Sequence, residues 1–176
     1  AADADRAGLA SLDAALAGGI RRVQVRLPGV GRLRRRALVS AAMSRCRAAR
    51  AELLVNGDPA LAHELGTGLH LRAAQLREFA GRPLPAAAPL AASCHDADGL
   101  RRAAAPGCDF AVLGPVRATP THSGRDGIGW SRFAMLREQA SLPIYAIGGL
   151  ASGDIAHARQ HGAQGIAAIR ALWPPS

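Results

Sequence analysis

The stretch FAVLGPVRATPTHSG, residues 110–124, begins as an apolar run and turns at Gly114-Pro115 into a polar loop. The run is short and offers no polar position to solvent, which is typical of a strand buried on both faces in a parallel sheet. Similar runs recur, and they predict strands over 21–26, 51–56, 68–71, 89–94, 108–114, 143–148 and 165–169. Helical patterns lie between them, over about 32–49, 58–65, 73–79, 96–104, 130–140 and 152–161. This regular alternation predicts right-handed crossover units and an α/β fold.

Two architectures fit this alternation, a closed (β/α)8 TIM barrel and an open doubly wound sheet. The loop after the first strand lacks the GxGxxG pattern, which weakens the dinucleotide-binding version of the open sheet. A barrel has eight strands in roughly 250 residues, whereas these 176 residues give seven and open with a helical segment that aligns Leu9, Leu12 and Leu16. We therefore expect residues 1–176 to form a single barrel domain whose first strand is missing or lies upstream of residue 1.

The chain is strongly basic, with a formal net charge of +9, and all 22 of its basic residues are arginine. The absence of lysine, together with abundant alanine, indicates a codon bias rather than a nucleic-acid surface. The main cluster, GRLRRR at 31–36, opens a helical pattern in which we expect Leu33 and Leu38 to lie opposite a solvated arginine face. Aromatic residues make up only 3% of the chain, too few for stacking on bases, so no nucleic-acid partner is expected.

The three cysteines are widely spaced and form no CxxC motif, which argues against a disulfide framework and a structural zinc site. No apolar run approaches the roughly 20 residues that span a bilayer, and no signal peptide is visible. We expect a cytoplasmic protein without a membrane partner.

Ligands of parallel α/β folds bind at the carboxyl ends of the strands, where this chain places polar and cationic residues. Gly148 and Gly149, in the segment AIGGLASGD, are candidate phosphate ligands because glycine lets backbone N–H groups approach an anion; a tight turn with a helix cap is the alternative. Arg170 could add a contact to phosphate or be a surface arginine. His70 and His95 lack the carboxylate that usually accompanies a metal site, and we interpret them as buried neutral histidines or partners for a heterocycle.

Six segments, in order and at the expected strand ends, resemble the thiamin phosphate synthase/TenI superfamily over most of residues 9–172. They are VQVR, LLVNGD, GLHL, SCH, GPVRATPTH and PIYAIGGL. The resemblance implies a (β/α)8 barrel that joins hydroxymethylpyrimidine diphosphate to thiazole phosphate with loss of pyrophosphate. It also implies Mg²⁺ and cationic side chains that stabilise the departing diphosphate.

The resemblance assigns site residues to three groups of ligand atoms. Gln24 and His70 would face the aminopyrimidine. The residues that would contact its diphosphate are Arg26, Asn56 and Ser93. Those that would hold the thiazole phosphate are Thr119, Thr121, Gly148 and Gly149.

Several positions depart from the family pattern. Pro28 replaces a lysine, and Gly57 and Gln75 replace the two aspartates that would bind the metal. His122 replaces the lysine of the threonine loop, and Arg170 replaces a phosphate-binding serine. These changes fall on the diphosphate and phosphate contacts themselves, so synthase chemistry does not follow from the resemblance alone.

Three functions stay open at this point. The first is an enzyme of thiamin biosynthesis, either a synthase with a remodelled site, with Mg²⁺ and Asp58 as the candidate metal ligand, or a TenI-like thiazole tautomerase. In the tautomerase His122 would be the general base. The second is a binding module that senses thiamin precursors without turnover, fused behind a Nudix hydrolase domain as in similar divergent domains. The third is an unrelated phosphate-binding barrel; the oligomeric state stays open.

Overall fold

The computed structural model describes residues 2–118, 126–169 and 171–173. The first half of the chain contains α1 (Ala2–Ala17), β1 (Arg22–Val25), α2 (Arg32–Ala48), β2 (Glu52–Asn56), α3 (Pro59–Leu65), β3 (Gly68–Leu71) and the 3-10 helix η1 (Ala73–Arg77). The second half contains β4 (Leu90–Cys94), α4 (Ala97–Ala104), β5 (Phe110–Leu113), α5 (Gly129–Glu138), β6 (Ile144–Ile147), the 3-10 helix η3 (Ser152–Asp154), α6 (Ile155–Gln160) and β7 (Gly165–Ala167).

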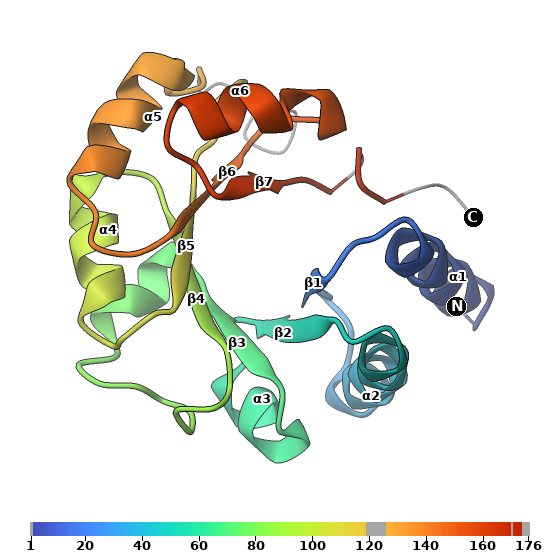
Figure 1. Ribbon diagram of the computed structural model, residues 1–176. Coiled ribbons are helices and arrows are strands. Elements are labelled where there is room, and N and C mark those ends of the chain that lie inside the picture. Colours follow the sequence, from blue (N-terminus) through green and yellow to red (C-terminus); the bar gives the residue numbers. More distant parts are fainter. Residues whose placement is uncertain (1, 119–125, 170, 174–176) are drawn as a thin grey trace.

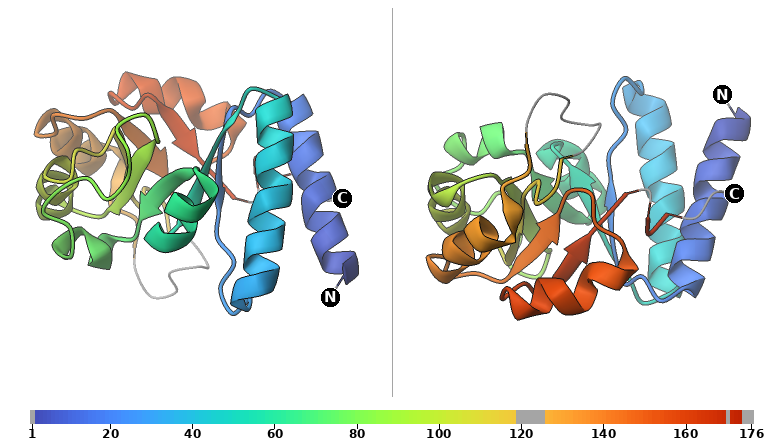
Figure 2. Two further views of the ribbon diagram at one scale, coloured as in Figure 1. Left: turned by 90° about the horizontal axis from the view of Figure 1, so that it is seen from below. Right: turned by 90° about the horizontal axis from the view of Figure 1, so that it is seen from above.

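The seven strands form one sheet in the order β1 to β7, and every neighbouring pair is parallel. The sheet curls around a central axis, and the helices lie outside it (Figure 1). Both views of Figure 2 place α1 beside α2, at the β1 side of the sheet. The fold is therefore an α/β barrel-like fold whose curled sheet has β1 and β7 at its edges. This confirms the predicted fold class. The strand expected upstream and the single-domain organisation stay predictions.

The main hydrophobic core lies between the sheet and the surrounding helices. Val39 of α2, Leu69 of β3, Leu90 of β4 and Phe133 of α5 are all fully buried there. The predicted face of the first helix is confirmed, since its Leu12 packs into this core with 2% of its surface exposed. Alternate residues of a strand point to opposite faces, so each strand supplies this outer core and also lines the inside of the curled sheet.

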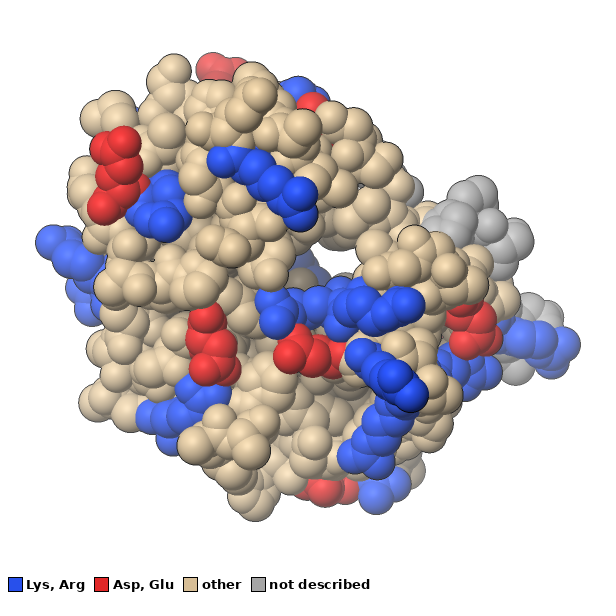
Figure 3. All heavy atoms as spheres, viewed as in Figure 1, with Lys and Arg blue, Asp and Glu red and all other residues tan. Residues whose placement is uncertain are grey.

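A second, smaller cluster fills the inside of the curled sheet, and it includes Leu54 and Phe110, with Tyr145 packed against them. At the amino ends of the strands Arg22 lies over the Phe110 ring, 4.2 Å from its centroid, and donates to the Tyr145 hydroxyl at 3.0 Å. Its Nε also pairs with Glu52 at 2.5 Å. In the view of Figure 3, arginine side chains lie beside a central hollow, and acidic side chains are scattered further out.

The predicted apolar face of the 32–49 helix was wrong at Leu33, whereas Leu38 is half-buried. Leu33 is 85% exposed, and the buried positions of α2 are Val39, Ala42 and Cys46. Arg35 lies one turn before Val39 and is half-buried, so an arginine begins the stripe that faces the sheet. The solvated arginine face was predicted correctly for its neighbours, since Arg36 is exposed and pairs with Glu64. The segment predicted as a helix over 73–79 is a shorter 3-10 helix.

Candidate active site at the carboxyl ends of the strands

Polar side chains form a layer on the inner face of the first two strands, above the apolar interior cluster. Asn56 is two residues beyond the interior Leu54, and strand alternation therefore places it on the same inner face. Gln24 is the parallel-register partner of Leu54, and Arg26 follows it by two residues just after β1. The structure thus brings Gln24, Arg26 and Asn56 together at one end of the sheet.

The next two strands extend this layer with a buried histidine. His70 is the register partner of Asn56, only 3% of it is exposed, and its Nε2 lies 2.8 Å from the Ser93 hydroxyl oxygen of β4. Burial lowers the pKa of His70 to about 4, because the charged imidazolium would lose its solvation. His70 is therefore a neutral imidazole near pH 7, which can exchange a hydrogen bond with Ser93 or with a neutral heterocycle.

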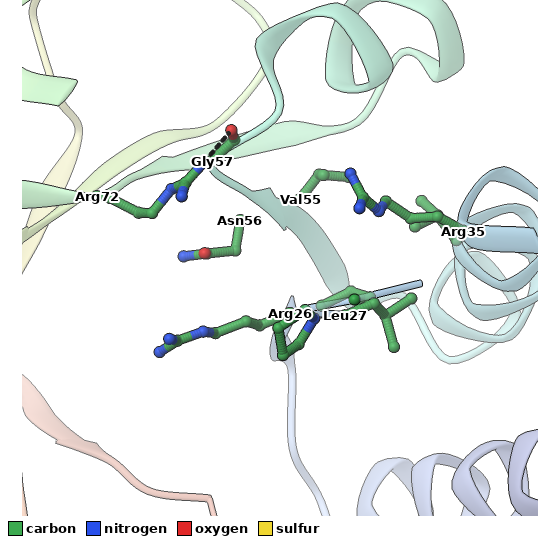
Figure 4. Close-up of a pocket in the computed structure, with 11 residues that line it drawn as sticks. Arg26, Leu27, Arg35, Val55, Asn56, Gly57 and Arg72 are labelled. Atoms are coloured by element: carbon green, nitrogen blue, oxygen red, sulfur yellow. Dashed lines mark hydrogen bonds between the residues drawn. The ribbon is translucent and has the colours of Figure 1, made fainter. Parts of the chain in front are cut away.

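A cavity of about 340 Å³ lies at the carboxyl ends of β1 and β2, beside α2. Its polar lining includes Arg26, Arg35, Asn56 and Arg72. Arg26, Asn56 and Arg72 come from three successive strand ends, and their polar groups extend into the same space (Figure 4). Three guanidinium groups around one cavity make it suited to an anion, because arginine stays charged and forms forked hydrogen bonds to phosphate.

Arg35 reaches the cavity from the first turn of α2. Its guanidinium donates to the Val30 carbonyl at 2.8 Å and pairs with Asp58 at 3.2 Å. Among the described residues, its buried Nε–H has no hydrogen-bond partner. A buried donor of this kind is costly unless a ligand or a water satisfies it, and it lies in a residue that lines the cavity.

The residues at the expected metal positions do not fit Mg²⁺, which prefers carboxylate oxygens. Gly57 has no side chain, and the Gln75 amide donates to the Gly57 carbonyl at 3.3 Å. The carboxylate of Asp58 accepts from the Leu61 N–H at 3.1 Å as the N-cap of α3 and pairs with Arg35. This geometry favours a capping role for Asp58. Within the described ranges no cluster of three or more His, Cys, Asp or Glu residues could hold a metal ion.

The predicted phosphate loop lies after β6 and packs tightly against the chain after β5. Gly148 and Gly149 adopt φ angles of 108° and 65°, which side chains other than hydrogen rarely tolerate. A Cβ at Gly148 would lie 2.5 Å from the Cβ of Pro115. The Val116 N–H also donates to the Ile147 carbonyl at 2.8 Å. The two loops therefore form one packed unit that depends on the glycines.

An ion pair between Arg117 and Asp154 also links these two loops. Arg117 donates to Asp154 in a forked pair at 2.7 and 3.1 Å, and also to the Gly149 carbonyl at 3.2 Å. Asp154 in turn accepts from the Ala151 N–H at 2.9 Å, and this backbone bond, with the Arg117 contact, holds the pKa of its carboxyl below the usual value. The Gly148–Gly149 turn is thus held by residues from both loops.

Four predicted residues lie outside the described residues, namely Thr119, Thr121, His122 and Arg170, and their roles stay predictions. Among the remaining candidates, the expectation of a buried His95 was wrong, since its side chain is exposed and its Nδ1 lies 2.6 Å from the Gly114 carbonyl oxygen. The three cysteines are free and buried, and burial raises the pKa of Cys94 to about 12. A thiol of this kind is a poor nucleophile and a poor metal ligand at neutral pH.

Sequence reasoning assigned no role to Arg35, Arg72 or Arg117. Arg72 directly follows the predicted strand 68–71, and this position alone could have placed it at the carboxyl rim. Arg35 was hidden in the GRLRRR cluster, because its neighbours are the solvated arginines. For Arg117 no signal in the sequence indicated the pairing with Asp154.

The curled parallel sheet, with a cationic cavity and a glycine loop at its carboxyl ends, defines an α/β barrel with a site suited to anions. The family described as thiamine monophosphate synthase (TMP-TENI) matches residues 1–172, and the chain belongs to this family. It is 34% identical over 169 residues to a thiamine-phosphate synthase of Thiobacillus denitrificans, covering 94% of this chain and 80% of that protein. It is also 34% identical over 167 residues to a thiamine-phosphate synthase of Prochlorococcus marinus, covering 93% of this chain and 47% of that protein.

A solved structure shares the fold. Thiamine phosphate pyrophosphorylase from Pyrococcus furiosus aligns with a TM-score of 0.75 at 20% identity, over 92% of this chain and 78% of that one. In the ranges that the structure describes, no helix has both the length and the apolar character needed to cross a membrane.

Proposed function

We propose that this domain of thiamin biosynthesis binds a phosphorylated thiazole and hydroxymethylpyrimidine diphosphate and joins them with loss of pyrophosphate. The observation that carries the proposal is the cavity at the carboxyl ends of β1 and β2, whose lining includes Arg26, Asn56 and Arg72. Negative charge develops on the diphosphate as it departs, and preorganised cations beside it lower the barrier.

The neutral layer beside the cavity suits the pyrimidine ring. Gln24 and the His70–Ser93 pair offer hydrogen-bonding groups without charge, and the inner face of the sheet carries them next to Asn56. The Gly148–Gly149 turn follows β6, far along the sheet from β1 and β2. Its backbone N–H groups would bind the phosphate of the thiazole.

The test is release of pyrophosphate from the two substrates together. We expect release only when both are present. An Arg26→Ala variant should lose about 100-fold or more in kcat/KM, whereas Arg101→Ala, on the exposed surface of α4, should keep the wild-type value. Equal activity of both variants would contradict the role of the cavity.

A second candidate is binding of thiamin precursors without turnover, and it is favoured by the replacement of the expected metal ligands at Gly57 and Gln75. Isothermal titration with thiazole phosphate and the pyrimidine diphosphate, followed by the pyrophosphate assay, separates the two functions. Binding without release would support a sensor. The resemblance also supports two further proposals: a TenI-like tautomerase with His122 as the general base, and fusion behind a Nudix hydrolase domain. Tautomerase activity of His122→Ala equal to that of the wild type would contradict the role of His122.

A further inference from the structure

The contact between Gly57 and Arg72 determines what kind of cation the cavity holds. Arg72 Nη2 donates to the Gly57 carbonyl at 3.0 Å, and the Gln75 amide donates to the same oxygen. Gly57 has a φ angle of 65°, and a Cβ built there would lie 2.2 Å from Arg72 Nε. The guanidinium therefore occupies the space that a side chain at position 57 would need.

This arrangement puts a cation and a neutral amide where the family resemblance implies two carboxylates. An aspartate at position 57 would point into the volume now filled by the Arg72 guanidinium, and Gln75 is neutral. The described lining of the cavity contains Arg26, Arg35 and Arg72 but no carboxylate. A divalent cation would meet like charges there and would lack the anionic oxygens that it prefers.

We propose that the cavity binds a diphosphate group through guanidinium groups without Mg²⁺, and that Arg72 supplies the charge that a metal ion would otherwise provide. A guanidinium offers several N–H donors in a fixed plane and matches two phosphate oxygens at once. The forked donors of Arg72 are already oriented by the Gly57 carbonyl, which reduces the ordering needed on binding. This inference rests on the proposed function, since it concerns the same diphosphate site.

Inorganic pyrophosphate is the probe, titrated calorimetrically into the whole chain with EDTA or with Mg²⁺ present. We expect binding in EDTA. Arg72→Ala should weaken pyrophosphate binding by about tenfold or more. The control is Arg77→Ala: Arg77 is exposed at the end of η1, which directly follows Arg72, and its loss should change the affinity less than twofold. Wild-type affinity of Arg72→Ala in EDTA would overturn the role of Arg72.

A triple variant, Gly57→Asp with Arg72→Ala and Gln75→Asp, removes one positive charge from the site and adds two carboxylates. We expect this variant, shown to be folded by circular dichroism, to bind pyrophosphate only with Mg²⁺, and equal binding in EDTA would overturn the inference.

The wild-type chain also separates this inference from the function on which it rests. Binding that requires Mg²⁺ in the wild type would overturn the metal-free site but leave the proposed function standing. If neither pyrophosphate nor the pyrimidine diphosphate binds in either buffer, both fail.

Discussion

Lowering the pH from 7 to 5 should destabilise the folded chain through His70, and replacing this residue by glutamine should remove that loss. Burial lowers the pKa of His70 to about 4 in the folded chain, whereas the ordinary value of 6.5 holds after unfolding. The unfolded chain therefore gains a proton below pH 6.5 that the folded chain gains only near pH 4. The stability that neutral His70 contributes is fully present above pH 6.5 and is lost as the pH falls toward 4.

The size of this loss follows from the two pKa values of His70. Their difference, at about 1.36 kcal/mol for each pKa unit, gives about 3 kcal/mol in total and about 2 kcal/mol between pH 7 and 5. Urea unfolding followed by circular dichroism at pH 7, 6 and 5 measures it in the wild type, in His70→Gln and in His63→Gln, an exposed control on α3. The same pH dependence in the wild type and His70→Gln, or an imidazole that titrates above pH 6 by NMR, would refute the reasoning.

Three further outcomes concern packing. Gly148→Ala should lower the free energy of unfolding by about 1–3 kcal/mol because of its positive φ and the contact with Pro115, while Gly153→Ala, which has open space, should change it by less than about 0.5 kcal/mol; urea unfolding compares them. Leu90→Ala should cost about 2–5 kcal/mol, and the exposed Leu33→Ala almost nothing, in the same assay. A thiol reagent at neutral pH should leave the three buried cysteines unmodified until urea is added.

The succession of strands could be predicted from the sequence because each strand is a short apolar run bounded by turn residues, as FAVL and IYAI are. The inner polar layer was also predictable, since residues at strand ends such as Asn56 and Ser93 follow the period of two. Both inferences use only local periodicity, and they suffice because parallel strands place their carboxyl ends at the same edge of the sheet.

The cationic character of the cavity could be predicted only in part: Arg26 was expected at the diphosphate, but the directions in which the Arg35 and Arg72 side chains point depend on packing and on contacts distant in sequence. The pattern of α2 places apolar residues on two sides, and the choice between Leu33 and Val39 as the buried side is made by packing against the sheet. Arg35 is carried into the cavity by that choice. Likewise, the contact of Arg72 with Gly57 joins residues 15 apart in the chain and has no periodic signature.

The shared space of Gly57 and Arg72 also has an evolutionary consequence. An aspartate at position 57 would collide with the guanidinium unless Arg72 moved, and loss of Arg72 alone would leave the cavity with Arg26 and Arg35 but without the guanidinium beside Gly57. The effects of substitutions at positions 57 and 72 are therefore not expected to be additive, because the two side chains share one space. Two relatives that differ at both positions should therefore be compared by the pair of residues and not by either residue alone.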